Sequence, residues 1–437
     1  MAPHGDAFDA DAWLDSLEAI GWRLGLERMN ALCDELGRPQ DRFGTIHVVG
    51  TNGKSSVTRM TAAALGAEGL RSGCLTSPHL ASWSERVLVD GREPEPRAFS
   101  DSVRLTAAAA ENVNRSLETG ESVTQFEVST AAGFVLMAEA GVEVAVVEAG
   151  LGGRLDATNT IDSAVTVLTS IGLDHTEWLG QTELEIASEK LAVLKPGTTL
   201  VLGPVAREVR KLAIETAEIR GCRVVEPGAG LPPGLEPRSP ALYQRGNLAL
   251  ALAAATEYLS SAGLPDDRPG PARAEGSGDP LGPEALKAAA AAASLPGRLE
   301  RLAADPPVYF DVAHNPSAAE ALAQSLPAVA NGAPVVAVLA MLDDKDAGGV
   351  IAALAPVLDR AVFTGLPPEL LAGSARPGAK AHDPSALVDL AGPLGIGAEA
   401  LEPPSAALDR AVEIARETGG IVVLAGSHYL PHPGRMT

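Results

Sequence analysis

The sequence GTNGKSS, residues 50–56, decides the fold, because it lies between an apolar run at 45–49 and helix-forming text at 54–68. In a strand–turn–helix of this kind, backbone N–H groups of the glycine-rich turn wrap a polyphosphate that the helix N-terminus faces. Lys54 is expected to reach the terminal phosphates, and the hydroxyl of Ser55 or Ser56 to meet Mg²⁺, with Ser56 favoured. Only two residues separate the glycines, unlike the standard P-loop spacing, so an ordinary strand-to-helix turn is the alternative.

The chain around this turn alternates between short apolar runs and longer amphipathic ones. The apolar runs predict strands at 45–49, 73–76, 142–147, 164–169 and 199–202. The amphipathic runs predict helices at 54–68, 97–117, 124–140, 183–190, 206–219 and 243–262. This rhythm predicts an α/β fold, in which helices cover both faces of a mostly parallel sheet.

A second alternating block lies further along the chain. It predicts strands at 308–312, 335–339, 361–363 and 421–424, with helices near 316–328, 346–356 and 405–417. The text at about 264–283 is rich in proline, glycine and charge, which predicts a flexible linker. The length of 437 residues also favours more than one core. We therefore predict a P-loop domain over 1–295 and a smaller, Rossmann-like domain over 296–437.

The charge balance restricts the partners. With 34 basic and 56 acidic residues, the chain carries a formal charge of −22. Nucleic acid and anionic membrane surfaces attract clustered Lys and Arg, so neither is an expected partner. An anionic substrate would need a local positive site in a negatively charged molecule. The simplest interpretation of the net charge is that it keeps the protein soluble.

Several features favour the cytoplasm. The three cysteines, Cys33, Cys74 and Cys222, fit neither a zinc-binding nor a disulfide spacing, which indicates a reducing compartment. The first residues show neither a basic region nor an apolar run, so no signal peptide is expected. No run of 18 uncharged apolar residues predicts a transmembrane helix.

The sequence EAGLGGRLDATN, residues 148–159, follows the apolar run VEVAVV. A carboxylate at the carboxyl end of a strand lies where ligands bind to open α/β sheets, and Glu148 is suited to Mg²⁺. The glycines allow another backbone to approach closely. A glycine-rich surface loop with a solvated glutamate is the alternative.

Two shorter motifs complete the first domain. Asp174-His175 follows the strand text AVTVLTS, and Glu189-Lys190 lies on a predicted helix fifteen residues further on. Taken alone, a histidine at a strand end is usually structural, and a helical lysine is usually solvated.

The second domain carries four candidate motifs. Arg298, in PGR at 296–298, can clamp a phosphate, and Asp311, in DVAHNP at 311–316, can accept a hydrogen bond from a ribose hydroxyl. Asn315 is alternatively a helix cap. The charged run at 343–346 is most simply a solvated turn, and GSH at 426–428 is expected at the carboxyl edge of the sheet.

Together these motifs resemble those of the folylpolyglutamate synthase/dihydrofolate synthase family, within the Mur ligase superfamily. The resemblance runs from about residue 13 to 430 and rests on a dozen motifs in order. They are GTNGKSS, SPHL (77–80), ER (85–86), FE (126–127), EAGLGGRLDATN, SIGLDH (170–175), LG (179–180), EK (189–190), PGR, DVAHNP, MLDDKD (341–346) and GS (426–427).

The resemblance implies a site for ATP, Mg²⁺ and two organic substrates. Catalytic roles are implied for Lys54, Glu148, His175, Lys190 and His314. ATP is expected at Thr51, Asn52, Gly53, Lys54, Ser55, Ser56, Asn247, Arg298 and Asp311. Two Mg²⁺ sites are expected from Ser56, Ser77, Glu148, His175 and a carbamylated Lys190, with a monovalent cation as a further expectation.

The substrates implied by the resemblance are small molecules bound by a monomer. Dihydropteroate or a reduced folate is expected beside Arg23, Leu24, Gly25, Thr124, Gln125, Phe126, Glu127, Leu155, Asp156 and Ala157. L-Glutamate is expected near His314 and Ser427. The implied activity is the bifunctional bacterial one, in which glutamate is joined to dihydropteroate and then to folates through an acyl phosphate.

The chain departs from the family pattern in four places. Ser55 stands where the family usually has glycine, and Leu191–Val193 replaces Ala-Gly-Ile. Arg23 stands where an aspartate is common, and Gln125 replaces a tyrosine. The last two motivate a second hypothesis, a diverged ligase acting on another aryl carboxylate. A third is a nucleotide-binding protein without ligase turnover.

Overall fold

The computed structural model describes residues 8–17, 23–228, 230–261, 281–366, 371 and 378–430. The chain divides into two compact units, Met1–Pro237 with Gly246–Ala293 and Arg238–Arg245 with Ser294–Thr437. The short segment Arg238–Arg245 groups with the second unit, which the sequence did not predict. The linker expected at 264–283 falls outside the described residues, except for 281–283.

The described part of the first unit contains a seven-stranded sheet in the order β3-β2-β4-β1-β5-β6-β7. Neighbouring strands are parallel, apart from the antiparallel pair β2 and β3. The strands are β1 (Gly44–Val49), β2 (Ser72–Leu75), β3 (Val87–Val89), β4 (Val144–Glu148), β5 (Val165–Leu168), β6 (Thr199–Leu202) and β7 (Arg223–Val225). The predicted α/β class is thereby confirmed.

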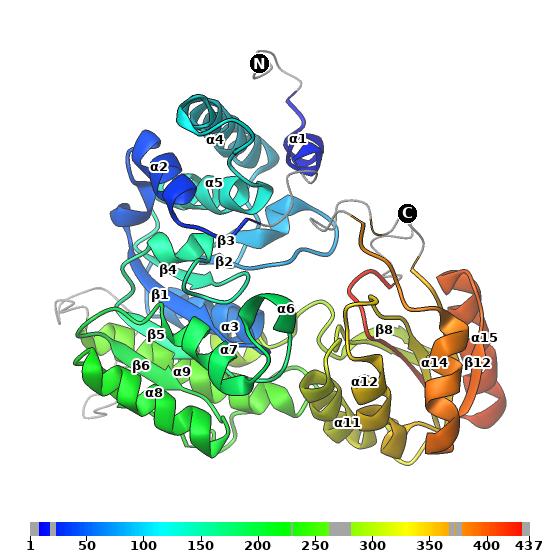
Figure 1. Cartoon of the computed structure of the whole chain (residues 1–437). Coiled ribbons are helices and arrows are strands. Elements are labelled where there is room, and N and C mark those ends of the chain that lie inside the picture. Colours follow the sequence, from blue (N-terminus) through cyan, green and yellow to red (C-terminus); the bar gives the residue numbers. More distant parts are fainter. Residues whose placement is uncertain are drawn as a thin grey trace. The chain divides into compact units, whose positions relative to one another are not determined.

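Helices cover both faces of this sheet because its central strands are apolar on both sides (Figure 1). On β4, Ala145 and Val147 join a core with α2 (Glu27–Glu35), α4 (Pro96–Ser116) and α5 (Gln125–Glu139). Val144 and Val146 point the opposite way, into a core with α3 (Lys54–Ala67), α9 (Tyr243–Ser261) and α10 (Pro283–Ala291). The continuous apolar sequence of β4 is typical of a strand that is buried on both faces of its sheet.

The remaining helical elements of the first unit are short or lie at its periphery. They are α1 (Ala10–Ser16), η2 (Pro39–Arg42), η3 (Trp83–Arg86), η4 (Ala157–Thr160), α6 (Thr176–Leu179), α7 (Glu183–Leu191) and α8 (Arg207–Ile219). The predicted helices at 183–190 and 206–219 match α7 and α8. The three-residue strands β3 and β7 were not predicted, because so short a run has no readable period.

The second unit, over its described residues, contains a six-stranded sheet in the order β12-β11-β10-β13-β9-β8. Only β8 runs antiparallel to its neighbour. The strands are β8 (Glu300–Ala304), β9 (Pro307–Phe310), β10 (Val335–Leu339), β11 (Arg360–Phe363), β12 (Gly397–Ala400) and β13 (Ile421–Ala425). The helical elements are α11 (Pro316–Ala330), α12 (Ala347–Leu354), η5 (Ala355–Val357), α14 (Pro384–Ala391), η6 (Gly392–Leu394) and α15 (Pro404–Thr418).

The sheet of the second unit packs α11, α12 and α14 on one core, built by residues such as Leu322, Ile351 and Leu387. β13, the last strand in the chain, pairs with both β10 and β9 in the centre of the sheet. This order places the carboxyl ends of β9, β10 and β13 at one edge, where the second unit's candidate residues follow. No helix of the described residues is long and apolar enough to cross a membrane.

Candidate active site

The loop that follows β1 is braced against the segment that follows β5. The backbone N–H of Thr51 donates to the Ser170 carbonyl at 2.8 Å, and that of Asn52 donates to Ser170 Oγ at 3.0 Å. Thr169 Oγ1 donates to the Asn52 carbonyl at 2.6 Å. These bonds hold a turn that α3 continues directly.

Gly53 begins α3 in the left-handed region, with φ +85°, which suits a residue without a side chain. A Cβ added here would lie 2.5 Å from Asn247 Oδ1, so this residue of α9 packs against the loop, as expected for an ATP-contacting residue. Lys54 Nζ donates to the Thr51 carbonyl at 3.2 Å. A cation and a helix N-terminus therefore meet at one turn, which is the arrangement that binds phosphate.

Glu148 closes this turn from the end of β4. Its Oε1 accepts a hydrogen bond from Ser55 Oγ at 3.0 Å, and its Oε2 accepts one from the backbone N–H of Ser77 at 3.1 Å. Ser56, favoured from the sequence, is only 1% exposed on the core side of α3, in line with buried Val57 and Met60. Ser55 therefore places a hydroxyl beside the carboxylate, and the choice between Ser55 and Ser56 as the Mg²⁺ ligand stays a prediction.

Lys190 reaches the same region from α7. The glycine-rich loop lies directly on this helix, since a Cβ on Gly153 would lie 3.0 Å from Lys190 Cα. The lysine is 5% exposed, and burial, followed by the nearby charge of Lys54, lowers its pKa to about 7, while Asp174 and Asp156 oppose the shift. A buried lysine with this pKa is largely neutral above pH 7.

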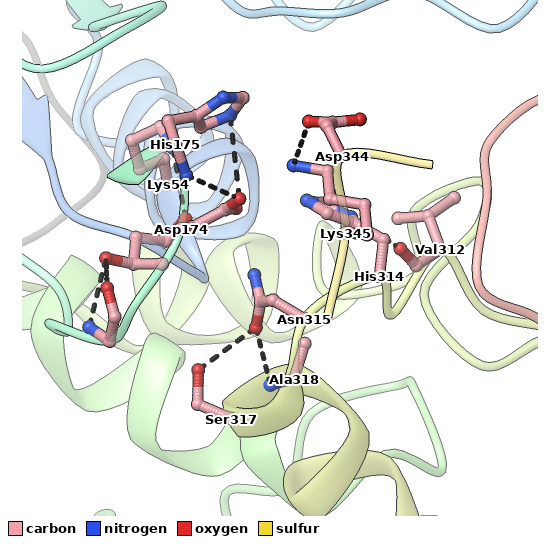
Figure 2. A network of polar contacts seen from close by, with 12 residues as sticks. Lys54, Asp174, His175, Val312, His314, Asn315, Ser317, Ala318, Asp344 and Lys345 are labelled. Atoms are coloured by element: carbon pink, nitrogen blue, oxygen red, sulfur yellow. Dashed lines mark hydrogen bonds and ion pairs between the residues drawn. The ribbon is translucent and has the colours of Figure 1, made fainter. Parts of the chain in front are cut away.

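Asp174 and His175 follow β5. His175 has φ +51° and begins α6, and its Nε2 lies 3.9 Å from Asp174 Oδ1. Figure 2 shows Asp174, His175 and Lys54 gathered at one place in the first unit. Asp174 was quoted in the sequence motif but was given no role. An acidic residue just after a strand was the signal that could have identified it.

The donor set around Glu148 fits Mg²⁺. Among the described residues, no group of three or more His, Cys, Asp and Glu side chains could hold a metal by itself. Mg²⁺ does not need one, because it is usually bound by one or two carboxylates together with substrate phosphates and waters. Glu148 and Ser55 supply hard oxygen ligands beside the phosphate-binding turn, whereas Ser77 approaches Glu148 through its backbone N–H.

The acceptor residues expected on α5 are engaged in holding the fold. Thr124 and Glu127 form a capping box at the start of the helix, and Glu127 also pairs with Arg28 at 3.1 Å. Gln125 is 4% exposed and donates from Nε2 to the Leu14 carbonyl of α1 at 2.8 Å. Phe126 differs, because a Cβ on Gly150 would collide with its ring, so it packs against the glycine-rich loop.

Asp156 is likewise buried, at 3% exposure. It accepts hydrogen bonds from the backbone N–H groups of Leu151 at 2.7 Å and Thr158 at 3.0 Å, and from Thr158 Oγ1 at 2.5 Å. Burial raises its pKa, and these donors oppose the rise. Its neighbour Leu155 is 41% exposed, and Ala157 is buried at the start of η4.

The segment before α2 presents a further apolar side chain. Leu24 is 38% exposed, Gly25 has φ +151°, and Arg23 donates to the Gly120 carbonyl at 2.9 Å. Of the exposed acceptor-side residues, Leu24 and Leu155 are thus apolar and Arg23 is charged, whereas the acidic residues are buried.

In the second unit, Asp311 joins three parts of the chain. It accepts hydrogen bonds from Tyr243 Oη at 2.6 Å, from the backbone N–H of Leu299 at 2.9 Å and from that of Ala313 at 2.9 Å. Burial raises the pKa of Asp311, while Tyr243 and Arg298 oppose the rise. Tyr243 was not among the expected residues, and its sequence gave no signal beyond a helical position.

His314, the residue expected near glutamate, has its Nδ1 2.8 Å from the Val312 carbonyl. A carbonyl only accepts, so Nδ1 carries a proton, which leaves Nε2 as the nitrogen that can take up another. Asn315 caps α11 by accepting from the Ala318 N–H at 2.9 Å, as its alternative interpretation predicted (Figure 2).

Two polar residues lie at the carboxyl ends of β10 and β13. Ser427 is 2% exposed and accepts from the Tyr429 N–H at 3.1 Å. Lys345 has a side chain only 8% exposed, with Nζ 3.8 Å from Asp344 Oδ2. The interpretation of 343–346 as a solvated turn is therefore wrong for Lys345.

Comparisons with known proteins agree with this geometry. Residues 48–228 match the Mur ligase middle domain, and residues 297–428 match the Mur ligase glutamate ligase domain. A dihydrofolate synthase/folylpolyglutamate synthase of Mycobacterium tuberculosis is 35% identical over 78% of this chain and 74% of its own. The protein of that name from Escherichia coli is 34% identical over 80% of each chain.

Solved structures extend the comparison. Mycobacterium tuberculosis folylpolyglutamate synthase, complexed with ADP and AMPPCP, superposes with a TM-score of 0.82 at 31% identity, covering 97% of both chains. An Escherichia coli relative complexed with DHPP and ADP gives 0.79 at 30% identity, covering 98% of this chain and 97% of its own. A bifunctional folylpolyglutamate synthase/dihydrofolate synthase with Mn, AMPPNP and L-glutamate bound gives 0.78 at 30% identity, over 98% of each chain.

The phosphate-binding turn, the carboxylate beside it, the two matched domains and relatives above 30% identity over most of the chain lead to one conclusion. The chain belongs to the dihydrofolate synthase/folylpolyglutamate synthase family of Mur ligases and is an ATP-dependent ligase that forms a carbon–nitrogen bond.

Proposed function

We propose that this ligase joins L-glutamate to dihydropteroate and then extends folates with further glutamate. The convergence of Ser55 Oγ and the Ser77 N–H on Glu148, beside Lys54 and the helix N-terminus, carries the proposal. The relatives' names and bound molecules, namely ADP, DHPP and L-glutamate, support the choice of substrates.

The chemistry requires activation of the acceptor carboxylate. A carboxylate is a poor acyl donor, because its leaving group would be oxide. A carboxylate oxygen therefore attacks the γ-phosphorus of ATP, ADP leaves, and an acyl phosphate results. The amine of glutamate then attacks the acyl carbon, phosphate leaves with the C–O bonding pair, and the amine loses its proton.

The first unit supplies the groups for phosphoryl transfer. Lys54 and the α3 N-terminus neutralise the phosphates, and Glu148 with the hydroxyl of Ser55 or Ser56 would hold Mg²⁺. Ser77 and His175 are the remaining residues that we expect around Mg²⁺ in this unit. Mg²⁺ supplies positive charge to the phosphate oxygens, where the transition state needs it. Keeping water away from the acyl phosphate is a further requirement.

Lys190 is proposed to carry a carbamate derived from CO₂. Only the neutral amine attacks CO₂, and burial favours that form by lowering the pKa of Lys190 to about 7. The carbamate would replace a buried cation with anionic oxygens beside the expected metal. Asp174, which lies close enough to influence Lys190, would then orient His175 rather than balance a cation.

In the second unit, Arg298 and Asp311 are proposed to contact ATP, as Asn247 is in the first. Asp311 already accepts three protein hydrogen bonds, so its first role is to hold Leu299 and thus the adjacent Arg298. His314 and Ser427 are proposed to bind glutamate, and the lone pair on His314 Nε2 suits removal of a proton from the amine.

The acceptor is proposed to lie along Leu24, Phe126 and Leu155. Gln125, whose change from tyrosine motivated another aryl carboxylate as substrate, is buried under α1. This observation removes one of the two reasons for the alternative substrate, and the change at Arg23 remains the other.

We further propose that the protein acts as a monomer in the cytoplasm, with a monovalent cation as an additional ligand. The described cysteines Cys33, Cys74 and Cys222 are all free, which suits a reducing compartment. Sedimentation with and without substrates tests the monomer.

One assay tests the proposed function. ADP release is measured with glutamate plus dihydropteroate, with glutamate plus tetrahydrofolate, and without acceptor. Glutamate-dependent release with dihydropteroate is the expected result. No release with either pterin contradicts the proposal, and release without any acceptor indicates an ATPase.

A further inference from the structure

His47 is a buried titratable residue that the reaction chemistry above does not use. It lies on β1, three residues before Gly50 of the phosphate-binding turn, and is 0% exposed. Its Nε2 lies 2.8 Å from Thr158 Oγ1. Thr158 Oγ1 in turn lies 2.5 Å from Asp156 Oδ1, so three polar side chains form one buried chain.

The hydrogen-bond partners of Asp156, the last of these three side chains, decide the direction of each hydrogen bond between them. Asp156 accepts from the backbone N–H of Leu151 on one oxygen and from that of Thr158 on the other. Because both of its oxygens accept from backbone N–H groups, we assign Asp156 as a carboxylate, and the hydroxyl proton of Thr158 then points to it. His47 must then donate from Nε2 to Thr158 Oγ1.

The other ring nitrogen of His47 agrees with this assignment. Nδ1 is buried and has no hydrogen-bond partner. If Nδ1 carries the lone pair of a neutral imidazole, no buried N–H group is left without an acceptor. An unpaired N–H donor would cost more than an unpaired lone pair. Burial, reinforced by Lys195, lowers the pKa of His47 to about 3, so the ring stays neutral.

The chain ends on the loop that carries the proposed acceptor residues. Asp156 ties Leu151 to Thr158 and so brackets the loop from which Leu155 is exposed. The same loop rests on Phe126 through Gly150. A strand that leads into the phosphate-binding turn is thereby also connected to the acceptor loop, and both lie within the first unit.

We propose that His47 is a positioning residue for the ligase reaction, which fixes the acceptor-binding loop through Thr158 and Asp156. In this role His47 keeps the loop placed against Phe126. His47 itself contacts neither ATP nor the reacting atoms. The identity of the loop as the acceptor's binding site rests on the proposed function.

Two substitutions break the chain and two preserve it. His47→Phe removes the donor, and Thr158→Val removes the hydroxyl. His47→Gln keeps an N–H donor and Thr158→Ser keeps the hydroxyl. We expect the KM for dihydropteroate to rise about tenfold in the first pair, the scale of one buried hydrogen bond to a charged group. The KM for ATP stays within about twofold, and the second pair recovers most of the loss.

Thr166→Val is the matched control. Thr166 is a fully buried threonine of β5 in register with His47 on β1, and its hydroxyl lies 3.3 Å from Ser163 Oγ, so it neighbours His47 without belonging to the three hydrogen-bonded side chains. It should leave both KM values unchanged. Equal rises in the KM for ATP and for dihydropteroate in His47→Phe, or the same split in Thr166→Val, would overturn the proposal.

Hydrogen exchange separates this proposal from the proposed function. In the ligand-free protein, a peptide covering 149–160 should exchange faster in His47→Phe and Thr158→Val than in the wild type, while the 50–56 peptide is unchanged. This result needs no acceptor, so it holds even if dihydropteroate is not the substrate. Unchanged exchange in both variants would contradict the role of His47, and Thr158→Val carries the test if His47→Phe does not fold.

Discussion

The phosphate side and the acceptor side of the first unit were identified from similar motifs, yet their residues behave differently. On the phosphate side, Lys54, Glu148 and Lys190 bring ionisable groups to one place. On the acceptor side, Glu127 and Asp156 direct theirs at the protein's own backbone and at Arg28. Polar motif residues therefore present ionisable groups in one region and hold loops in the other.

The difference has a physical origin. Phosphates and Mg²⁺ are charged, so they need charged partners that are organised but not neutralised by the protein. A flat aromatic acceptor is bound mainly by apolar contact, with few polar groups. Leu24 and Leu155, the exposed apolar residues on the acceptor side, fit that description, and Arg23 is the exposed charged residue beside them.

Glu148→Gln tests the phosphate side and has the largest expected effect. We expect kcat to fall about a thousandfold, because an amide is a poor Mg²⁺ ligand, although its one oxygen still accepts from the Ser77 N–H and its NH₂ can donate to Ser55 Oγ. The thermal midpoint should change little. Glu189→Gln, at an exposed carboxylate paired with Arg154 at 2.9 Å, is the control and should keep full activity. A fall of less than tenfold for Glu148→Gln would remove this residue from the chemistry.

Lys190→Ala tests the carbamate. Activity should be lost by about a hundredfold or more, and short carboxylates such as acetate should restore part of it by supplying the missing oxygens. The measurement is ADP release with and without added carboxylate. Lys195→Ala, at a lysine whose Nζ donates to the Asn159 carbonyl at 3.3 Å, is the matched control and should show no rescue. Full activity of Lys190→Ala would contradict the assignment.

The sequence predicted the phosphate side better than the acceptor side for a local reason. Neighbouring residues determine the turn at 50–53, the helix that begins at 54 and the carboxylate at the end of β4. The local sequence is therefore sufficient to predict these features. The role of Glu127 depends on Arg28, and that of Gln125 on Leu14, both about a hundred residues away. Such pairings cannot be read without the fold.

The same argument applies to single side chains. Ser55 and Ser56 cannot be distinguished in the sequence, and only the structure shows that the Ser55 hydroxyl is bonded to Glu148 while Ser56 is buried. Lys345 is one charge in a charged run, and only the structure shows its burial. Tyr243 belongs to a segment whose placement in the second unit the sequence did not predict.

Glu127→Gln tests whether the acceptor side is mainly structural. Arg28 and Glu127 have side chains 8% and 4% exposed, so removing one charge leaves the other buried and uncompensated. We expect the free energy of unfolding to fall by about 3 kcal/mol, measured by urea denaturation. In Glu189→Gln, which removes a half-exposed pair, it should fall by less than about 1 kcal/mol. A rise in the KM for dihydropteroate without the expected loss of stability would contradict a mainly structural role for the acceptor side.

His47→Gln probes the acceptor side through its pH dependence. The folded-state pKa of His47 is lowered to about 3, whereas the unfolded chain takes up a proton near 6.5. Between these values the unfolded state binds more protons, so stability is lost as pH falls below about 6.5, by up to about 1.4 kcal/mol per pH unit. Urea titrations at pH 7, 6 and 5 should show a shallower loss in His47→Gln. An identical slope would mean that another group controls the acid limb.

Gln125→Met has the smallest expected effect and decides how the family's tyrosine position should be interpreted. The substitution keeps the length of the side chain and removes the Nε2 donor to the Leu14 carbonyl, so about 1 kcal/mol of stability should be lost. The KM for dihydropteroate should stay within about twofold, because the side chain lies under α1 rather than on an exposed surface. A tenfold rise in that KM at unchanged stability would instead show that position 125 reaches the acceptor. The loss of the aromatic residue would then bear on substrate choice, and the acceptor side would no longer be mainly structural.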